Sequence, residues 1–239
     1  MIKDEKNTIK KDFSINEKFS FIEKLTNMII KKEIPSLIIT GDGGLGKTYT
    51  VISAIEKAGL GDDECVYIKG YSTARGLYNN MYDNNGKLFV FDDCDSILDD
   101  KVAINLLKSA LDSYDKRTIS WMAKMSRNDE YPQQFEFNGR IIFISNKRRE
   151  KLNDALLSRS FFVDLSMTTD DKIERMENIL PTILPTYKIS VKKDALSFLK
   201  DVKDDTNTNL NLRSLIKVTK IINAFPNEWR DLATYSIAN

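Results

Sequence analysis

The feature that most constrains this chain is a glycine-rich run, Gly41 to Thr48, with the spacing GxxxxGK(S/T). It follows an apolar, β-prone stretch at 36–40 and precedes a helix-compatible stretch at 49–58. A strand, a glycine turn and a helix in this order separate a phosphate-binding loop from a chance match. Because such a turn presents backbone N–H groups to an anion at a helix N-terminus, the run predicts an α/β fold with a nucleoside triphosphate site.

Each residue type in this run, called the phosphate loop below, has an expected role. The glycines permit backbone angles closed to other residues, so successive N–H groups can turn inward around the β-phosphate. Lys47 is expected to reach the β- and γ-phosphates, and the Thr48 hydroxyl to join the shell of Mg²⁺. The expected cofactors are therefore ATP and Mg²⁺. The nucleotide-binding residues expected here are Gly41, Asp42, Gly43, Gly44, Leu45, Gly46, Lys47, Thr48 and Tyr49.

Composition excludes several classes of function. The 239 residues contain no histidine, which removes histidine catalysis and histidine-ligated zinc, and the two cysteines are too far apart in sequence to suggest a metal knuckle. No apolar run is long enough to span a bilayer and the N-terminus lacks an apolar signal, so we expect a cytoplasmic protein without a membrane partner. With Lys+Arg 36 against Asp+Glu 35, any contact with nucleic acid must come from a local patch.

The alternation of apolar stretches and helical patterns predicts the domain organisation. Residues 1–15 are polar and charged and are expected to form a flexible lead, followed by an α/β nucleotide-binding domain at 16–167. From 168 to 239 the pattern is helical only, which predicts a small all-helical lid domain. Strands are expected at 36–40, 65–69, 87–91, 140–145 and 161–165, and helices at 16–32, 49–58, 72–82, 95–114, 170–180, 192–202 and 212–225.

Two acidic residues follow a second buried strand. The apolar run 88–91 ends in Asp92 and Asp93, which places both carboxylates at the carboxyl edge of a parallel sheet, where nucleotides bind. Asp92 is expected to hold Mg²⁺ through water, and Asp93 to orient or deprotonate the attacking water.

A third apolar strand, at 141–144, ends in Ser145 and Asn146. With the phosphate loop and the acidic pair, this order resembles the AAA+ ATPases from about residue 36 to residue 220. The resemblance implies a P-loop NTPase parallel sheet flanked by helices, a helical C-terminal lid, ATP hydrolysis and a ring of identical subunits, a hexamer. It also assigns Asn146 to the sensor-1 position beside the attacking water.

Two arginines match further motifs of this family. The segment 155–160 resembles the Leu-x-Ser-Arg segment of clamp loaders, which assigns Arg159 as a finger that reaches the neighbouring subunit's ATP; Arg148 and Arg149 are the alternatives. The start of the last lid helix is similar to sensor 2, which implies that Arg213 contacts the γ-phosphate.

The chain also departs from the family pattern. Aspartate replaces the usual glutamate at Asp93, which leaves Asp95 as an alternative catalytic acid. The segment 70–86 is short for an aromatic pore loop, so Tyr71 is either a minimal pore aromatic or part of a capped turn.

Extra length lies instead between residues 111 and 138. The β-prone pieces 118–122 and 135–137 can form a hairpin before the sensor-1 strand, as in superfamily-three viral helicases, whose hairpin touches DNA. Lys124 and Arg127 near the tip, with Trp121 at the base, fit this role. Asp129 and Glu130 offset the positive charge of Lys124 and Arg127 at the tip, so the alternative is a surface hairpin that does not contact DNA.

Three functions remain open on sequence alone. The first is a phage- or virus-type AAA+ motor that moves or remodels DNA or loads a replication protein onto it. The second is a remodeller acting on a protein partner. The third is a nucleotide-gated scaffold with slow turnover, which the aspartate at position 93 would permit.

Overall fold

The computed structural model describes residues 13–122, 130–205 and 210–238. Within these ranges five parallel strands form one sheet in the order β2-β3-β6-β1-β7. All five expected strands are present, within a residue or two of their expected bounds. Their ranges are β1 Ser36–Thr40, β2 Cys65–Lys69, β3 Leu88–Asp92, β6 Arg140–Ser145 and β7 Phe161–Asp164.

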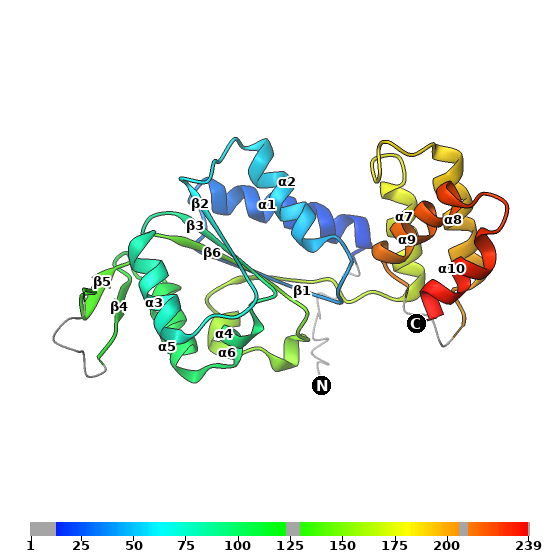
Figure 1. Ribbon diagram of the computed structural model, residues 1–239. Helices are drawn as coiled ribbons and strands as arrows, with labels where there is room; N and C mark the ends of the chain where they lie inside the picture. Colours follow the sequence, from blue (N-terminus) through cyan, green and yellow to red (C-terminus); the bar gives the residue numbers. More distant parts are fainter. Residues whose placement is uncertain (1–12, 123–129, 206–209, 239) are drawn as a thin grey trace, which may run out of the picture.

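Helices cover both faces of the sheet (Figure 1). On one face α1 (Ile15–Ile30) and α2 (Lys47–Lys57) pack against Leu37 and Ile39, and on the other α3 (Ala74–Asp83) and α5 (Lys101–Ala110) pack in a core with Ile38. Successive strand residues point to opposite faces. Because both faces are covered, the strands read as continuous apolar runs instead of alternating ones.

One expected helix is divided. The pattern at 95–114 predicts a single helix, but α4 (Asp95–Asp99) ends before Asp100, which caps the start of α5. The Asp100 carboxylate accepts hydrogen bonds from the backbone N–H of Val102 at 2.7 Å and of Ala103 at 3.1 Å. An aspartate that satisfies two free donors at a helix start favours a new helix over continuation of the old one.

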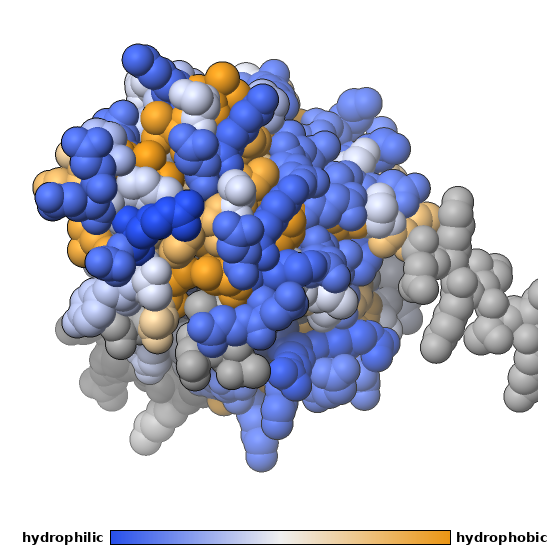
Figure 2. Space-filling view, turned by 90° about the vertical axis from the view of Figure 1, so that its right-hand side faces the viewer, coloured by the Kyte–Doolittle hydropathy of each residue, from blue (hydrophilic) through white to orange (hydrophobic). Residues whose placement is uncertain are grey.

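The strand β7 leads into helices only. These C-terminal helices are α7 (Thr169–Ile179), α8 (Ile189–Asp201), α9 (Leu212–Ala224) and α10 (Trp229–Ala238), and they share a core of their own. Figure 1 places them at one end of the molecule, and the space-filling view of that end shows apolar side chains at the surface between polar ones (Figure 2). The helix α10 was not expected from the sequence; Ala233 is its one residue fully buried in this core. The domain boundary at 168 stays a prediction.

A small hairpin lies at the end of the molecule opposite the C-terminal helices (Figure 1). Its strands β4 (Thr118–Ser120) and β5 (Gln134–Glu136) are antiparallel, which confirms the hairpin expected before β6. The Tyr78 hydroxyl donates to the Pro132 carbonyl at 2.6 Å, so the hairpin is held against α3. Across the described residues, no helix combines the length and apolar character needed to cross a membrane.

Candidate functional site

The phosphate loop joins β1 to α2 at the carboxyl edge of the sheet. Its glycines Gly41, Gly44 and Gly46 have φ angles of 140°, 76° and 92°, a region that L side chains rarely adopt. A Cβ atom on Gly41 would lie 2.9 Å from the Leu165 carbonyl oxygen. The glycines therefore permit a turn that other residues would strain, and α2 starts directly after it with its N-terminal N–H groups toward the turn.

Lys47 is held inside this turn. Its ammonium donates to the carbonyl oxygens of Gly41 at 2.6 Å and Asp42 at 2.8 Å, and to the side-chain oxygen of Asn146 at 2.9 Å. Burial lowers the pKa of Lys47, while the nearby carboxylates of Asp93, Asp42 and Asp92 oppose that shift. The arrangement presents a positive charge in a partly desolvated loop, where an anion is attracted more strongly than in water.

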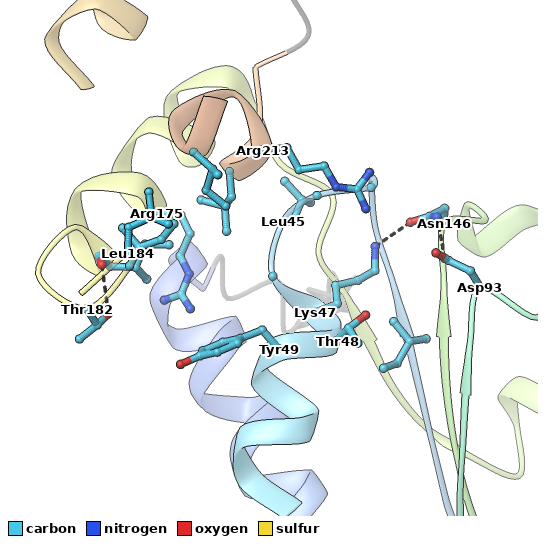
Figure 3. Close-up of a pocket in the computed structure, with 18 of the residues that line it drawn as sticks. Leu45, Lys47, Thr48, Tyr49, Asp93, Asn146, Arg175, Thr182, Leu184 and Arg213 are labelled. Atoms are coloured by element: carbon cyan, nitrogen blue, oxygen red, sulfur yellow. Dashed lines mark hydrogen bonds between the residues drawn. The ribbon is translucent and has the colours of Figure 1, made fainter. Parts of the chain in front are cut away.

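The acidic pair and the expected sensor residue meet at the same place. The Asn146 amide donates to the Asp93 carboxylate at 2.7 Å, so Lys47, Asn146 and Asp93 form a continuous chain of hydrogen bonds (Figure 3). Asp93 has φ 55°, an unusual backbone angle for a residue other than glycine, and its N–H donates to the Ile144 carbonyl. Backbone in this region is strained and persists where surrounding contacts hold it.

Asp95, the alternative catalytic acid, does not face the cavity that Asp93 lines. Its carboxylate accepts a hydrogen bond from the Ser145 hydroxyl at 2.6 Å, and it is not among the residues that line the cavity beside the phosphate loop. Asp93 does line that cavity. The geometry therefore favours Asp93 over Asp95 for contact with a bound molecule.

The residues expected to hold a divalent cation fit Mg²⁺. The Thr48 hydroxyl donates to the Asp92 carboxylate at 2.8 Å, and the Lys69 ammonium lies 3.3 Å from the other Asp92 oxygen. Within the described ranges no group of three or more acidic, cysteine or histidine side chains could hold a metal by itself. A hydroxyl and one carboxylate suit Mg²⁺, because this ion keeps several waters and takes further oxygens from substrate phosphates.

A cavity of about 500 Å³ extends from the phosphate loop to the C-terminal helices. Lys47, Asp93, Asn146 and Arg213 line one part of it, and Arg213 projects from α9 toward the loop (Figure 3). The backbone of Leu212 donates to the Gly44 carbonyl at 3.0 Å, and Lys172 of α7 lies 3.5 Å from the Asp42 carboxylate. Two of the C-terminal helices thus contact the loop directly.

Arg159 lies away from this cavity. Its guanidinium donates to the Ala155 carbonyl at 3.0 Å, and its own carbonyl accepts from the hydroxyl of Ser36, the first residue of β1. The phosphate loop follows the last residue of β1, so Arg159 lies at the opposite edge of the sheet, beside a second cavity of about 560 Å³. Of the alternatives, Arg149 packs over the Phe162 ring and Arg148 precedes a short 3-10 turn, Arg149–Lys151.

The remaining expected residues either do not line the cavity or lie outside the residues that the structure describes. Tyr71 is 79% exposed just after β2. Lys124 and Arg127 lie outside the described residues, whereas Trp121 at the hairpin base packs against Tyr78.

Sequence reasoning missed several cavity residues on the C-terminal helices and the loop that follows α7. Apart from Asn211 and Leu212, which belong to the segment similar to sensor 2, no motif marks them, because their place depends on how the helices pack against the phosphate loop. They are Arg175, Ile179, Thr182, Ile183, Leu184, Pro185, Leu212 and Ile216, with Lys172 and Asn211 beside the loop.

No family model matches the chain. It is 32% identical over 240 aligned positions to an uncharacterized 36.7 kDa protein from the nrdC-mobD intergenic region of Enterobacteria phage T4; the match covers 92% of this chain and 73% of that protein.

Among solved structures, the chain is similar to the RuvB Holliday junction branch migration motor of Thermotoga maritima, with 13% identity and a TM-score of 0.52. A point mutant of that protein gives 14% identity and the same score. Each match covers 88% of this chain and 61% of the RuvB chain, so this chain spans about three fifths of their length. At this identity the likeness concerns the fold, which is the AAA+ fold.

Proposed function

Because the chain belongs to the same family as the uncharacterized 36.7 kDa phage T4 protein and has an AAA+ fold, we propose that it is an Mg²⁺-dependent ATPase. The observation that carries this proposal is the hydrogen-bonded chain from Lys47 through Asn146 to Asp93, next to the bond between Thr48 and Asp92. These residues come from two strand ends and a helix start, and all of them except Asp92 line one cavity.

Each residue has a role in the proposed reaction. The phosphate loop binds the triphosphate through its N–H groups, and Lys47 moves its hydrogen bonds from loop carbonyls to the β- and γ-phosphates. Thr48 and Asp92 hold Mg²⁺, which neutralises charge on the phosphate oxygens. Asp93 orients the attacking water and accepts its proton, and Asn146 fixes the Asp93 carboxylate by donating to it.

Arg213 and Arg159 complete the proposed site from two subunits. Arg213 contacts the γ-phosphate from α9, as its place in the cavity permits. Arg159 acts on the neighbouring subunit's ATP in a ring, a hexamer, because it lies at the sheet edge away from its own phosphate loop. A guanidinium in this role stabilises charge on the transferring phosphoryl group.

We further propose that the protein works on DNA in the cytoplasm of the infected cell, as a motor or a loader of a replication protein. The phage relative and the hairpin before β6 support this, with Lys124 and Arg127 as the contacts. The second candidate function, remodelling of a protein partner, is favoured by Tyr71, an aromatic side chain 79% exposed at the sheet's carboxyl edge.

The test is the rate of ATP hydrolysis with single-stranded DNA, double-stranded DNA or no DNA. Stimulation by either DNA supports the DNA role. Hydrolysis that DNA leaves unchanged, and that still needs Mg²⁺ and Asp93, contradicts the DNA role and favours a protein partner. Replacing Lys124 and Arg127 together by Ala should reduce the stimulation and the salt dependence of DNA binding, because two phosphate contacts are lost.

A further inference from the structure

Arg175 of α7 is a cation in the nucleotide cavity that the proposed reaction does not use. It lines the same cavity as Lys47, and Figure 3 shows it projecting from α7 toward Tyr49, beside Thr182 and Leu184. The catalytic residues Asp93 and Asn146 lie on the other side of the phosphate loop in this view.

The surroundings of Arg175 identify this part of the cavity as the base subsite, if the cavity binds a nucleoside triphosphate as proposed above. The charged part, near Lys47 and Arg213, suits the phosphates. The part near Arg175 is bordered mainly by apolar side chains, which suit a planar base. The apolar residues that line the cavity from α7 and from the loop after it are Ile179, Ile183, Leu184 and Pro185.

The guanidinium of Arg175 is fixed in place but has donors to spare. Its central carbon lies 3.8 Å from the centroid of the Phe19 ring, and Nη1 donates to Asn16 at 3.3 Å and Asn178 at 3.4 Å. Nε is buried and cannot be reached by a bound molecule, whereas Nη2 has no acceptor among the described residues and keeps its two N–H groups for one. No described carboxylate forms an ion pair with it either.

We infer that Arg175 determines base specificity by donating hydrogen bonds to acceptors on the edge of the nucleotide base. A guanidinium offers only donors, in a fixed planar fork, and Nη2 is the arm of that fork left free here. On the same edge guanine presents two acceptors, N7 and O6, whereas adenine presents the N7 acceptor beside an amino donor. Arg175 therefore contributes more to the binding of GTP than of ATP.

The test compares wild type with Arg175→Met by calorimetric titration with Mg²⁺ and ATP, GTP or inorganic tripolyphosphate. We expect the substitution to weaken GTP binding by about tenfold or more, the usual effect of losing a hydrogen bond to a charged group. ATP binding should weaken less, and tripolyphosphate, which has no base, should bind unchanged. Arg175→Lys retains the charge over Phe19 without the fork, and should show the same order of losses.

Equal losses for the two nucleotides and tripolyphosphate would mean that Arg175 only fastens α7 to α1, and would overturn the inference. A loss for ATP equal to or larger than that for GTP, or no loss, would overturn it as well. If the wild type binds neither nucleotide nor tripolyphosphate, the proposed function itself fails. Thermal unfolding of each variant without ligand separates these results from a folding defect.

Discussion

Replacement of Gly44 by Ala tests whether the C-terminal helices contact the phosphate loop. Gly44 has φ 76°, and a Cβ atom there would lie 3.0 Å from Cγ and 3.1 Å from Oδ1 of Asn211. That Asn211 oxygen cannot move freely, because it caps α9 by accepting from the N–H groups of Arg213 at 2.8 Å and Ser214 at 3.2 Å. The new methyl group must therefore displace the cap or separate α9 from the loop.

The magnitude follows from two contributions. A left-handed backbone costs an L residue about 1–2 kcal/mol, and loss of a helix cap costs about 1 kcal/mol. Gly59 is a matched control, since it also has φ 76° but a Cβ atom there meets nothing within 4 Å. Gly59→Ala should show the backbone cost alone.

The assay is thermal unfolding together with ATP titration of both variants. One kcal/mol corresponds to roughly 2–4 °C for a chain of this size, so Gly44→Ala should melt about that much below Gly59→Ala. Gly44→Ala should also bind ATP more weakly, whereas Gly59→Ala should bind like wild type. Equal melting temperatures and equal affinities in the two variants would refute the contact between α9 and the loop.

Three further predictions concern the acids, the arginine finger and a buried thiol. Asp93→Asn should bind ATP but lose most hydrolysis, measured as phosphate release; persistence near the wild-type rate would move the role to Asp95. Mixed rings of Arg159→Ala and Lys47→Ala subunits should regain activity, because some interfaces pair an intact loop with an intact finger, and co-assembled mixtures without rescue would argue against action between subunits. Burial raises the pKa of the Cys94 thiol to about 11 from an ordinary 9.0. As pH rises, this thiol therefore ionises in the unfolded chain before it ionises in the folded protein. Between these two pKa values the free energy of unfolding should fall as pH rises, and it should fall less in Cys94→Ala than in the wild type. Denaturant titrations across this pH range measure it, and the same pH dependence in both proteins would contradict the prediction.

The local motifs were predictable because each depends on a few neighbouring residues. The phosphate loop needs glycines followed by Lys47 and Thr48, and a buried strand that ends in acids must deliver them to the carboxyl edge of the sheet. Such rules predict the α/β fold and place Lys47, Asp92, Asp93 and Asn146 at one edge of the sheet from the sequence alone.

What the sequence did not reveal depends on contacts between distant elements. Arg175 enters the cavity only because α7 packs beside α1, and Asn211 reaches Gly44 only because α9 meets the loop. The break at Asp100 was missed for another reason: an apolar pattern that continues across a cap looks like one helix. The signal for the break is Asp100 itself, because aspartate is a preferred residue at the start of a helix.

Direct titration with ATP and Mg²⁺ tests whether the phosphate loop binds ATP. The wild type should bind, and ATP at about 100 times its Kd should stabilise the fold by about 2.7 kcal/mol through mass action. Lys47→Ala should bind far more weakly while melting, without ligand, as a folded protein. If Lys47→Ala binds ATP as tightly as the wild type, or if the folded wild type does not bind ATP, the phosphate loop is not an ATP site.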